Sequence, residues 1–204
     1  MVSIIIYFYY MKNILLFGCL VVLLMSFSIT KKQASHKTIC KEKIIDTVFV
    51  CLPCGYGCDN LVYKESGFCA HCNMPLVNKA TIFFKNIEPA EICSFIRKRG
   101  KQKVVLLDVR TNEEFTGNAP DKFGRLDGAI NIPVQELANR IKELDQYKNK
   151  DILVYCSHSH RSPRASYLLT QNGFKKVTNM LYGMSEWNNK VKEDACNEKL
   201  FVKQ

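Results

Sequence analysis

The chain has 204 residues, enough for one ordinary domain and a small module but not for two large domains. Hydrophobic residues make up 47% of it and charged residues 24%, which is the composition of a globular protein. The net charge is +10, but the lysines are spread along the whole chain and no basic stretch alternates with aromatic residues. The composition therefore argues against a nucleic-acid-binding protein.

The first thirty residues predict a segment that leaves the cytoplasm. Lys12 is their only charged residue, and residues 14–29 are almost wholly apolar, like the hydrophobic region of a secretory signal. The apolar run is also close to the ~20 residues that span a bilayer, so a cleaved signal peptide and an uncleaved membrane anchor both stay open. Residues 31–45 are polar and lack periodicity, which predicts a linker. We therefore expect an exported protein, periplasmic or anchored facing the periplasm, that meets the membrane only through residues 1–30.

Residues 46–80 form a short segment rich in cysteine and glycine. Cys51 and Cys54 make one C-x-x-C pair, and Cys69 and Cys72 make a second pair; fourteen residues lie between the two pairs. This is the spacing of two zinc knuckles. So short a segment has too small a core to fold unaided, so a metal ion or disulfides must hold it. The paired knuckles favour zinc or another soft metal at these four cysteines, and two disulfides are the alternative that an extracytoplasmic location favours.

The second half of this segment, GFCAHCNMPLV (67–77), resembles the ending of a short heavy-metal-binding domain. The first half of that domain usually carries a histidine, and Cys54 stands at its place, so the resemblance keeps a ligand there. Cys58 has no evident place in this scheme. It could be an alternative ligand or the disulfide partner of Cys40. The resemblance implies a small zinc-ribbon-like module at the N-terminal side of the main domain.

After residue 80 the chain alternates between strand-like and helix-like segments. We expect strands at 81–85, 104–108, 129–133, 152–155 and 176–179, and helices at 89–98, 134–144, 162–172 and 184–191. Such alternation implies an α/β domain with a parallel sheet covered by helices on both faces. Ligands bind at the carboxyl ends of parallel strands, and two of the expected strands end there in reactive residues, at Asp108 and at Cys156. We assign residues 81–195 to this domain and 196–204 to a C-terminal tail.

Cys156 ends an apolar strand and begins a polar, cationic loop, DILVYCSHSHRS (151–162). The amide groups of such a loop, and the start of the helix that follows, direct positive potential at the sulfur and favour the thiolate. Arg161 and the histidines of the loop act in the same direction. A cysteine at the end of a core strand is most often a small buried hydrophobic residue, but a cationic loop is a poor setting for an inert thiol. We therefore predict that Cys156 is a nucleophile.

Five blocks of sequence, taken in order, resemble a rhodanese domain. They are LLDVRTNEEF (106–115), GRLDGAINIP (124–133), VYCSHSHRS (154–162), NGF (172–174) and GMSEWNN (183–189). The resemblance implies a sulfurtransferase in which Cys156 holds a sulfane sulfur as a persulfide, without a cofactor for catalysis. It also implies that Arg161 closes the loop and is held by an acidic group such as Asp108. Arg110 matches an arginine that anchors the loop or an anionic donor, and an ion pair of Asp108 with Arg110 that serves only the fold is the alternative.

The loop between the cysteine and the arginine contains the expected substrate-binding groups. The loop amides would cradle the transferred sulfur, and the side chains assigned to substrate binding are Ser157, His158, Ser159, His160 and Arg110. Four residues separate Cys156 from Arg161, as in rhodanese-type sulfur transfer, whereas relatives that act on phosphate or arsenate have five. The chain departs from the family pattern in two places. Ser159 replaces the usual glycine, which makes a positive φ less comfortable, and an insertion, NAPDKF, precedes residue 124.

These observations predict an exported rhodanese-type sulfurtransferase with a small metal-binding module. The donor would be a small sulfur-containing anion such as thiosulfate, and the acceptor a thiol, cyanide or a protein cysteine. The main alternative is a non-catalytic metal or sulfur carrier, or a module that docks a partner. A phosphatase or an arsenate reductase is disfavoured by the loop length. We expect Cys93 to be a core residue, and Cys196 could resolve a persulfide on Cys156.

Overall fold

The structure is a computed structural model that describes residues 47–192 and 195–204. The predicted signal or anchor (1–30) and the predicted linker (31–45), which contains Cys40, lie outside these described residues. Within the described part of the chain, no helix is long and apolar enough to cross a bilayer. The cysteine-rich segment and the α/β domain belong to one compact unit, residues 45–204.

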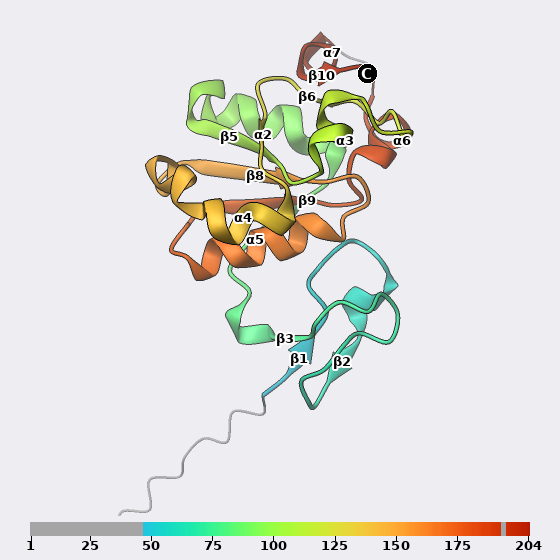
Figure 1. Ribbon diagram of the computed structural model, residues 1–204, viewed down its shortest axis with the longest axis vertical. Coiled ribbons are helices and arrows are strands. Elements are labelled where there is room, and N and C mark those ends of the chain that lie inside the picture. Colours follow the sequence, from blue (N-terminus) through green and yellow to red (C-terminus); the bar gives the residue numbers. More distant parts are fainter. Residues whose placement is uncertain (1–46, 193–194) are drawn as a thin grey trace, which may run out of the picture. The chain divides into compact units, whose positions relative to one another are not determined.

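The α/β domain is built on a five-stranded sheet in which every neighbouring pair of strands is parallel. The strand order is β4-β9-β8-β5-β7 (Figure 1). The strands are β4 (Lys85–Ile87), β5 (Val104–Asp108), β7 (Ile130–Asn131), β8 (Asp151–Tyr155) and β9 (Val177–Met180). Strands β5 and β8 pair through all five of their residues at the centre of the sheet. The near-continuous apolar sequences of these two strands fit burial on both faces.

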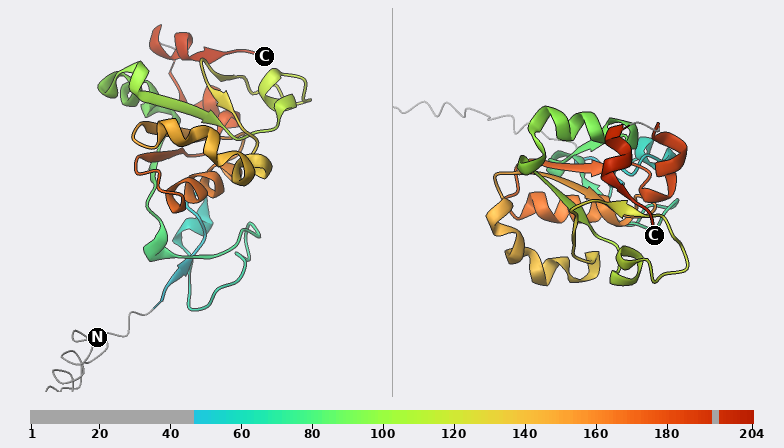
Figure 2. Two further views of the ribbon diagram at one scale, coloured as in Figure 1. Left: turned by 60° about the vertical axis from the view of Figure 1, so that its left-hand side comes forward. Right: turned by 90° about the horizontal axis from the view of Figure 1, so that it is seen from above.

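Helices cover the two faces of this sheet (Figure 2). Side chains of β8 alternate between the faces: Ile152 joins the core beneath helices α4 (Val134–Arg140) and α5 (Arg161–Gln171). Leu153 joins the opposite core, which contains side chains of α2 (Ile92–Arg99), α6 (Trp187–Lys190) and α7 (Ala195–Leu200). The predicted α/β fold, with a parallel sheet and helices on both faces, is therefore confirmed.

The remaining elements are short. They are helix α3 (Asn112–Thr116), the antiparallel pair β6 (Arg125–Leu126) and β10 (Phe201–Val202), and the 3-10 turns η2 (Lys79–Thr81), η3 (Pro89–Glu91), η4 (Lys101–Lys103), η5 (Ile141–Tyr147) and η6 (Met184–Glu186). A disulfide between Cys93 and Cys196 ties helix α2 to helix α7. Cys93 is buried, as expected, but Cys196 is already paired, so the suggestion that it resolves a persulfide on Cys156 is wrong for this structure.

The first predicted strand, at residues 81–85, is also wrong. The 3-10 turn η2 ends at Thr81, and only Lys85–Ile87 pairs with β9. Part of the apolar run still packs into the core: Phe84 is buried and Ile82 packs against the core, whereas Phe83 is exposed. Packing without strand pairing is enough to explain an apolar run, which the sequence pattern alone cannot distinguish from a short strand.

The cysteine-rich segment has a small antiparallel sheet of its own. Its strands are β1 (Phe49–Val50), β2 (Val62–Tyr63) and β3 (Val77–Asn78), in the order β2-β1-β3. The 3-10 turn η1 (Gly57–Asn60) lies between β1 and β2. A second turn lies between β2 and β3, where the Asn73 amide donates to the Cys69 carbonyl at 2.8 Å. Half of the buried residues of the segment are cysteines.

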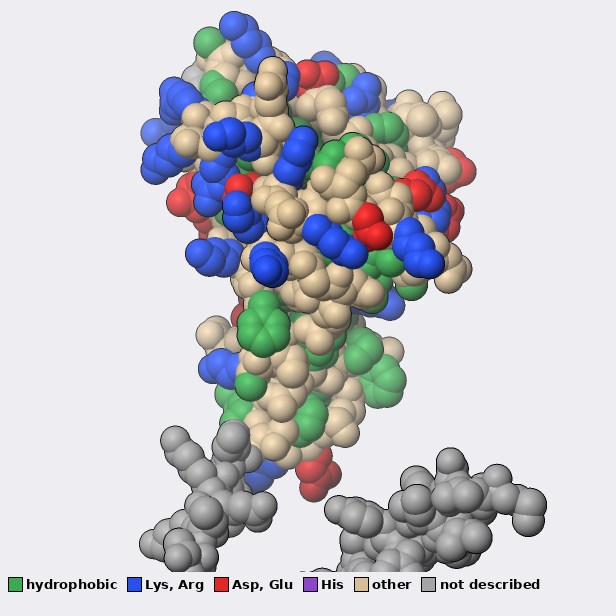
Figure 3. All heavy atoms as spheres, turned by 90° about the vertical axis from the view of Figure 1, so that its left-hand side faces the viewer, with side chains coloured by type: hydrophobic (Ala, Val, Ile, Leu, Met, Phe, Trp, Pro, Cys, Tyr) green, Lys and Arg blue, Asp and Glu red, His purple; other side chains and the backbone are tan. Residues whose placement is uncertain are grey.

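Positive charge gathers at the amino ends of the parallel strands. Exposed residues there include Lys101, Lys103, Lys150, Lys175 and Lys176. Figure 3 shows lysine and arginine side chains spread over this face. Cys156 follows the carboxyl end of β8, at the opposite end of the sheet. The net positive charge of the chain is therefore not concentrated around the predicted nucleophile.

Candidate active site

Cys156 directly follows β8, at the carboxyl edge of the sheet where the sequence predicted the site. Its side chain is 1% exposed. The sulfur lies 3.5 Å from the hydroxyl oxygen of Ser162, and the thiol can donate to that oxygen. Ser162 is buried in the first turn of α5, so the start of this helix faces the sulfur. In the thiolate form the same hydroxyl can donate to sulfur instead.

The loop after Cys156 is held by its carbonyl groups. The Cys156 carbonyl accepts a hydrogen bond from the Met184 amide at 2.9 Å, and the Ser157 carbonyl accepts one from the Ser185 amide at 3.0 Å. The amides of residues 157–160 donate no hydrogen bond to any protein group in the described part of the chain. Because the carbonyls are engaged and the amides are free, the loop can offer several N–H groups to one anion.

Gly183 allows this loop to approach the segment before η6. It has a φ of +77°, and a Cβ added there would lie 2.2 Å from the Ser157 carbonyl oxygen. Ser159 occupies the place where the family pattern has glycine, and it adopts a φ of +57°. Its hydroxyl donates to the Met180 carbonyl at 3.3 Å, and the side chain is fully buried. The departure in sequence therefore leaves the left-handed loop conformation in place, with one hydrogen bond to offset its cost.

Arg161 closes the loop through Glu114, not through Asp108. The guanidinium of Arg161 binds both carboxylate oxygens of Glu114, at 2.6 and 2.7 Å. The hydroxyl of Ser157 donates to Glu114 at 2.9 Å and accepts from Arg161. Burial alone would raise the pKa of Glu114, but the hydrogen bonds from Arg161, from the Thr111 amide and from Ser157 outweigh it and lower the pKa to about 2. Glu114 was not among the residues predicted from the sequence.

A signal for Glu114 was nevertheless present in the sequence. Thr111 and Glu114 form a capping box that begins helix α3: the Thr111 hydroxyl accepts from the Glu114 amide, and the Glu114 carboxylate accepts from the Thr111 amide. A threonine followed three residues later by glutamate is the usual pattern of such a box. The box fixes the carboxylate at the start of α3, where Arg161 can reach it.

Asp108 instead pairs with Arg110, and both side chains are fully buried. Three nitrogens of Arg110, its amide among them, donate to the carboxylate at distances between 2.7 and 3.0 Å. Arg110 also donates to the Gly124 carbonyl at 2.9 Å, so the pair ties the end of β5 to the segment after the insertion. The prediction that Asp108 holds Arg161 is therefore corrected. The geometry agrees with the alternative, an ion pair that serves the fold.

The two histidines of the loop lie at its exposed edge. The ring of His158 meets Phe123 edge-on, with centroids 5.3 Å apart. The ring of His160 stacks on Tyr56 of the cysteine-rich segment, with centroids 5.7 Å apart and planes 7° from parallel. Burial lowers the pKa of His160, and the charges of His158 and Arg161 lower it further. Neither histidine is hydrogen-bonded to the sulfur of Cys156, and their assignment to substrate binding stays a prediction.

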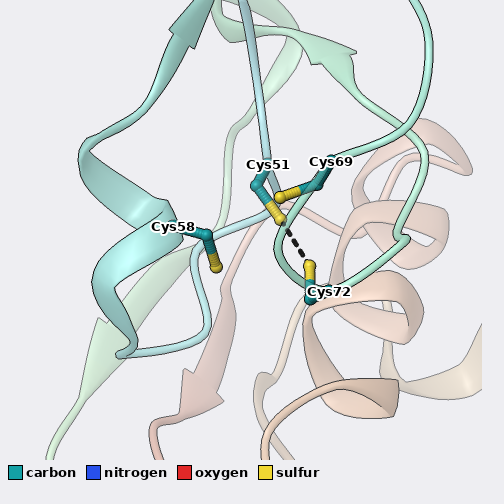
Figure 4. A group of neighbouring side chains, drawn as sticks. All are labelled: Cys51, Cys58, Cys69 and Cys72. Atoms are coloured by element: carbon teal, nitrogen blue, oxygen red, sulfur yellow. Dashed lines mark hydrogen bonds between the residues drawn. The ribbon is translucent and has the colours of Figure 1, made fainter.

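Three of the four predicted metal ligands lie together, and Cys58 takes the place that was predicted for Cys54. The sulfurs of Cys51, Cys58, Cys69 and Cys72 all lie within 4.8 Å of one another (Figure 4). The expected group had Cys54 where the structure has Cys58. Cys54 directs its thiol at Asp59 instead, with sulfur and carboxylate oxygen 3.3 Å apart. All these cysteines are free thiols, so the alternative of two disulfides is not formed in this structure.

Comparison with known proteins agrees with the fold of the domain. A model of the rhodanese-like domain family matches residues 94–190. The uncharacterized protein YqhL of Bacillus subtilis is 36% identical over 95 residues, which cover 47% of this chain and 69% of that protein. The "Putative thiosulfate sulfurtransferase, mitochondrial" of Schizosaccharomyces pombe is 31% identical over 107 residues, which cover 47% of this chain and 71% of that protein.

A third relative is the tRNA uridine(34) hydroxylase of Cytophaga hutchinsonii, which is 29% identical over 136 residues. This match covers 65% of the chain but 41% of the hydroxylase, so the chain spans less than half of that relative. The matches of family and relatives together place the chain in the rhodanese-like domain family.

Proposed function

We propose that the chain is a sulfurtransferase that carries sulfur on Cys156. The thiolate of Cys156 attacks the outer sulfur of a thiosulfate-like donor, the S–S bond of the donor breaks, and sulfite leaves with the bonding electron pair. The enzyme then holds a persulfide. An acceptor such as cyanide, a thiol or a protein cysteine attacks the outer sulfur of this persulfide, and the Cys156 thiolate returns. Both steps balance in charge and need no cofactor.

One observation carries this proposal: a buried cysteine directly follows a central strand and begins a loop whose amides are free and whose first two carbonyls are engaged. The transferred sulfur bears negative charge in the persulfide. Free N–H groups fixed in a dry loop stabilise such a charge more than water-exposed groups do, because they need no reorganisation. Arg161 acts as a positioning residue in this scheme, since its guanidinium is occupied by Glu114 and holds the loop closed.

The size of the loop supports sulfur over larger anions. Four residues separate Cys156 from Arg161, and the family resemblance connects the five-residue loop with phosphate and arsenate chemistry. Two of the four side chains, Ser157 and Ser159, are buried, and hydrogen bonds to Glu114 and to the Met180 carbonyl hold them in place. A relative named as a thiosulfate sulfurtransferase and another named as a sulfur carrier match the same domain. The second candidate is a non-catalytic sulfur carrier or a module that docks a partner, and the low exposure of Cys156 favours the docking role, because a buried sulfur limits both catalysis and carriage.

We also propose that the protein is exported and acts without nucleic acid. The apolar run at residues 14–29 supports export, and so does the disulfide between Cys93 and Cys196. Disulfides form and persist in oxidising compartments and are rare in the cytosol. The donor would then be a small anion of the periplasm, and membrane contact would be confined to residues 1–30.

Intact mass spectrometry tests the sulfur transfer directly. Wild-type protein treated with thiosulfate is expected to gain one sulfur, about 32 Da, and to lose it on treatment with cyanide. Cys156→Ala is expected to gain none, while the matched control Cys54→Ser, which removes a different buried thiol, keeps the adduct. A carrier without catalytic turnover would show the adduct but no sustained thiocyanate production. Absence of the adduct in wild-type protein, or its persistence in Cys156→Ala, would contradict the proposal.

A further inference from the structure

The four sulfurs of the cysteine-rich segment have the spacing of a tetrahedral metal site. A zinc ion bound at about 2.3 Å to four thiolates places its ligands about 3.8 Å from one another. The sulfurs of Cys51, Cys58, Cys69 and Cys72 lie within 4.8 Å of one another, and those of Cys51 and Cys72 are 3.3 Å apart. Figure 4 shows the four side chains converging from three separate stretches of backbone. Small adjustments of side chains would bring them to metal-bound distances.

The turn η1 decides which of two neighbouring cysteines joins this group. Asp59 accepts hydrogen bonds from the amides of Cys54 and Gly55, at 3.0 and 2.7 Å, and a contact from the Cys54 thiol. These bonds occupy the Asp59 carboxylate and hold the Cys54 sulfur beside it. Cys58 lies one turn further, with its sulfur 3.7 Å from that of Cys54, and faces the other three cysteines.

The core of the segment gives a reason for the ion. Three of the four sulfur-bearing residues are 1% exposed, and cysteines make up half of the buried residues in this part of the chain, the others being Val50, Leu52, Met74 and Leu76. A segment of this size gains too little from apolar burial to fold on its own. Thiols packed against one another are a weak core, whereas thiolates around one metal ion bind it with a folding free energy of their own.

We propose that Cys51, Cys58, Cys69 and Cys72 bind one zinc ion, and that this ion fixes the turn that carries Tyr56 against the loop of Cys156. On binding, the four thiols release their protons to solvent, and no electron is transferred. The metal site stands independently of the proposed sulfur transfer, because its residues, its distances and its test involve no reaction at Cys156.

Aromatic contacts connect the cysteine-rich segment to the loop of Cys156. Tyr56 lies between Cys54 and Cys58, stacks on His160 of the loop, and meets Tyr182 edge-on with centroids 6.0 Å apart. A Cβ added at Gly55 would lie 2.8 Å from the Tyr182 ring, so the turn and this ring are in close contact.

A cavity of about 350 Å³ lies between the two sites. Its lining residues are Tyr56, Cys58, His71, Cys72 and His160. Two of the proposed metal ligands, Cys58 and Cys72, therefore line the same cavity as His160 of the loop. Release of the ion would free Cys58, and with it the turn that holds Tyr56 on His160.

Metal content measured by mass spectrometry on the full-length chain tests the ligand set. Wild-type protein is expected to bind one equivalent of zinc. Cys58→Ser is expected to lose more affinity than the roughly 10–100-fold that removal of an outer-shell partner costs. The matched control Cys54→Ser keeps its zinc, and Cys58→His, which restores a ligand, recovers it. Cobalt bound in place of zinc reports the thiolates: its sulfur charge-transfer band falls in Cys58→Ser and is unchanged in Cys54→Ser. Equal loss in both serine variants, or wild-type protein isolated without metal and with a Cys51–Cys72 disulfide, would overturn the proposal.

Proton resonances of the histidine rings test the connection to the loop. The ring current of Tyr56 shifts the His160 protons, so removal of zinc by a chelator is expected to move them to the position seen in Tyr56→Leu. The same chelator is expected to leave His160 unmoved in Tyr56→Leu. His158 is the internal control, because its ring faces Phe123 of the α/β domain. If His160 keeps its resonance while zinc is lost, the proposed connection is refuted even where the metal site stands.

Discussion

Glu114→Gln is the substitution that most directly tests how the loop of Cys156 is held. The variant keeps the size of the side chain and removes its charge. In the wild type the carboxylate accepts two hydrogen bonds from Arg161 and one from Ser157, and the side chains of Glu114 and Arg161 are 18% and 25% exposed. The pair is therefore shielded from most of the solvent, which makes it stronger than an exposed ion pair.

The magnitude follows from the pKa of Glu114. Burial opposes ionisation, yet the bonds from Arg161 and its neighbours lower the pKa from 4.5 to about 2. A difference of about 2.5 units corresponds to roughly 3 kcal/mol of stability, at 1.36 kcal/mol per unit. Because the folded-state pKa is the lower one, this stability is present above pH 4.5 and is lost as the pH falls toward 2. By pH 3 about 1.5 kcal/mol of it should remain.

Urea unfolding of the wild type and of Glu114→Gln at several pH values measures this contribution. The variant is expected to be less stable by about 3 kcal/mol at pH 7, and the difference should shrink by half at pH 3. Glu113→Gln is the matched control, because it removes an exposed carboxylate from the same helix and should leave the stability close to that of the wild type. A difference that is absent at pH 7, or that does not depend on pH, would refute the role of Glu114.

Three further changes test the structure around the site. Gly183→Ala is expected to cost at least about 2 kcal/mol of unfolding free energy, because its Cβ would collide with the Ser157 carbonyl at a positive φ. Ser159→Ala is expected to lower the free energy of unfolding by about 1 kcal/mol, because the hydrogen bond to the Met180 carbonyl is lost. Ser159→Gly is expected to lower it by less, because glycine adopts the positive φ of this residue without strain. Urea unfolding of both variants measures the difference. Cys93→Ser opens a disulfide to Cys196 across 103 residues and is expected to lower stability by up to about 4–5 kcal/mol under oxidising conditions only, which a thermal melt with and without reductant measures.

The sequence predicts the centre of the fold better than its margins. The runs that became β5 and β8 are apolar except for one terminal aspartate in each, which fits strands buried on both faces. Helix α3 and the β6–β10 pair are five residues or fewer, and such short elements leave little periodicity to read. The disulfide joins cysteines 103 residues apart, and no local pattern announces a pairing over that distance.

At the candidate site, the predicted nucleophile and its loop could be located because they are contiguous in sequence. Cys156 ends a strand and Arg161 begins a helix, so the spacing alone fixes the size of the loop. The partner of Arg161 comes from 47 residues away and could not be found by spacing. Its capping box could have been recognised, but such a box predicts only where a helix starts, and it does not say which cation the carboxylate will meet.

The two corrected assignments have one physical cause, the limited capacity of a carboxylate for hydrogen bonds. An ionised carboxylate offers about four acceptor sites. Asp108 uses its sites on the amide and guanidinium of Arg110, so it has none left for Arg161, whereas Glu114 is free to take that role. Asp59 likewise engages the amide and the thiol of Cys54, which keeps that cysteine out of the proposed metal site and leaves the place to Cys58. Spacing in the sequence shows which residues can meet, and the acceptor sites already occupied decide which of them do. Asp59→Ala should therefore let Cys54 compete with Cys58 for the proposed ion. Cys58→Ser alone is expected to lose zinc, and adding Asp59→Ala to it should restore part of the zinc affinity. If the double variant shows no recovery, the backbone of the turn, and not Asp59, selects the ligand.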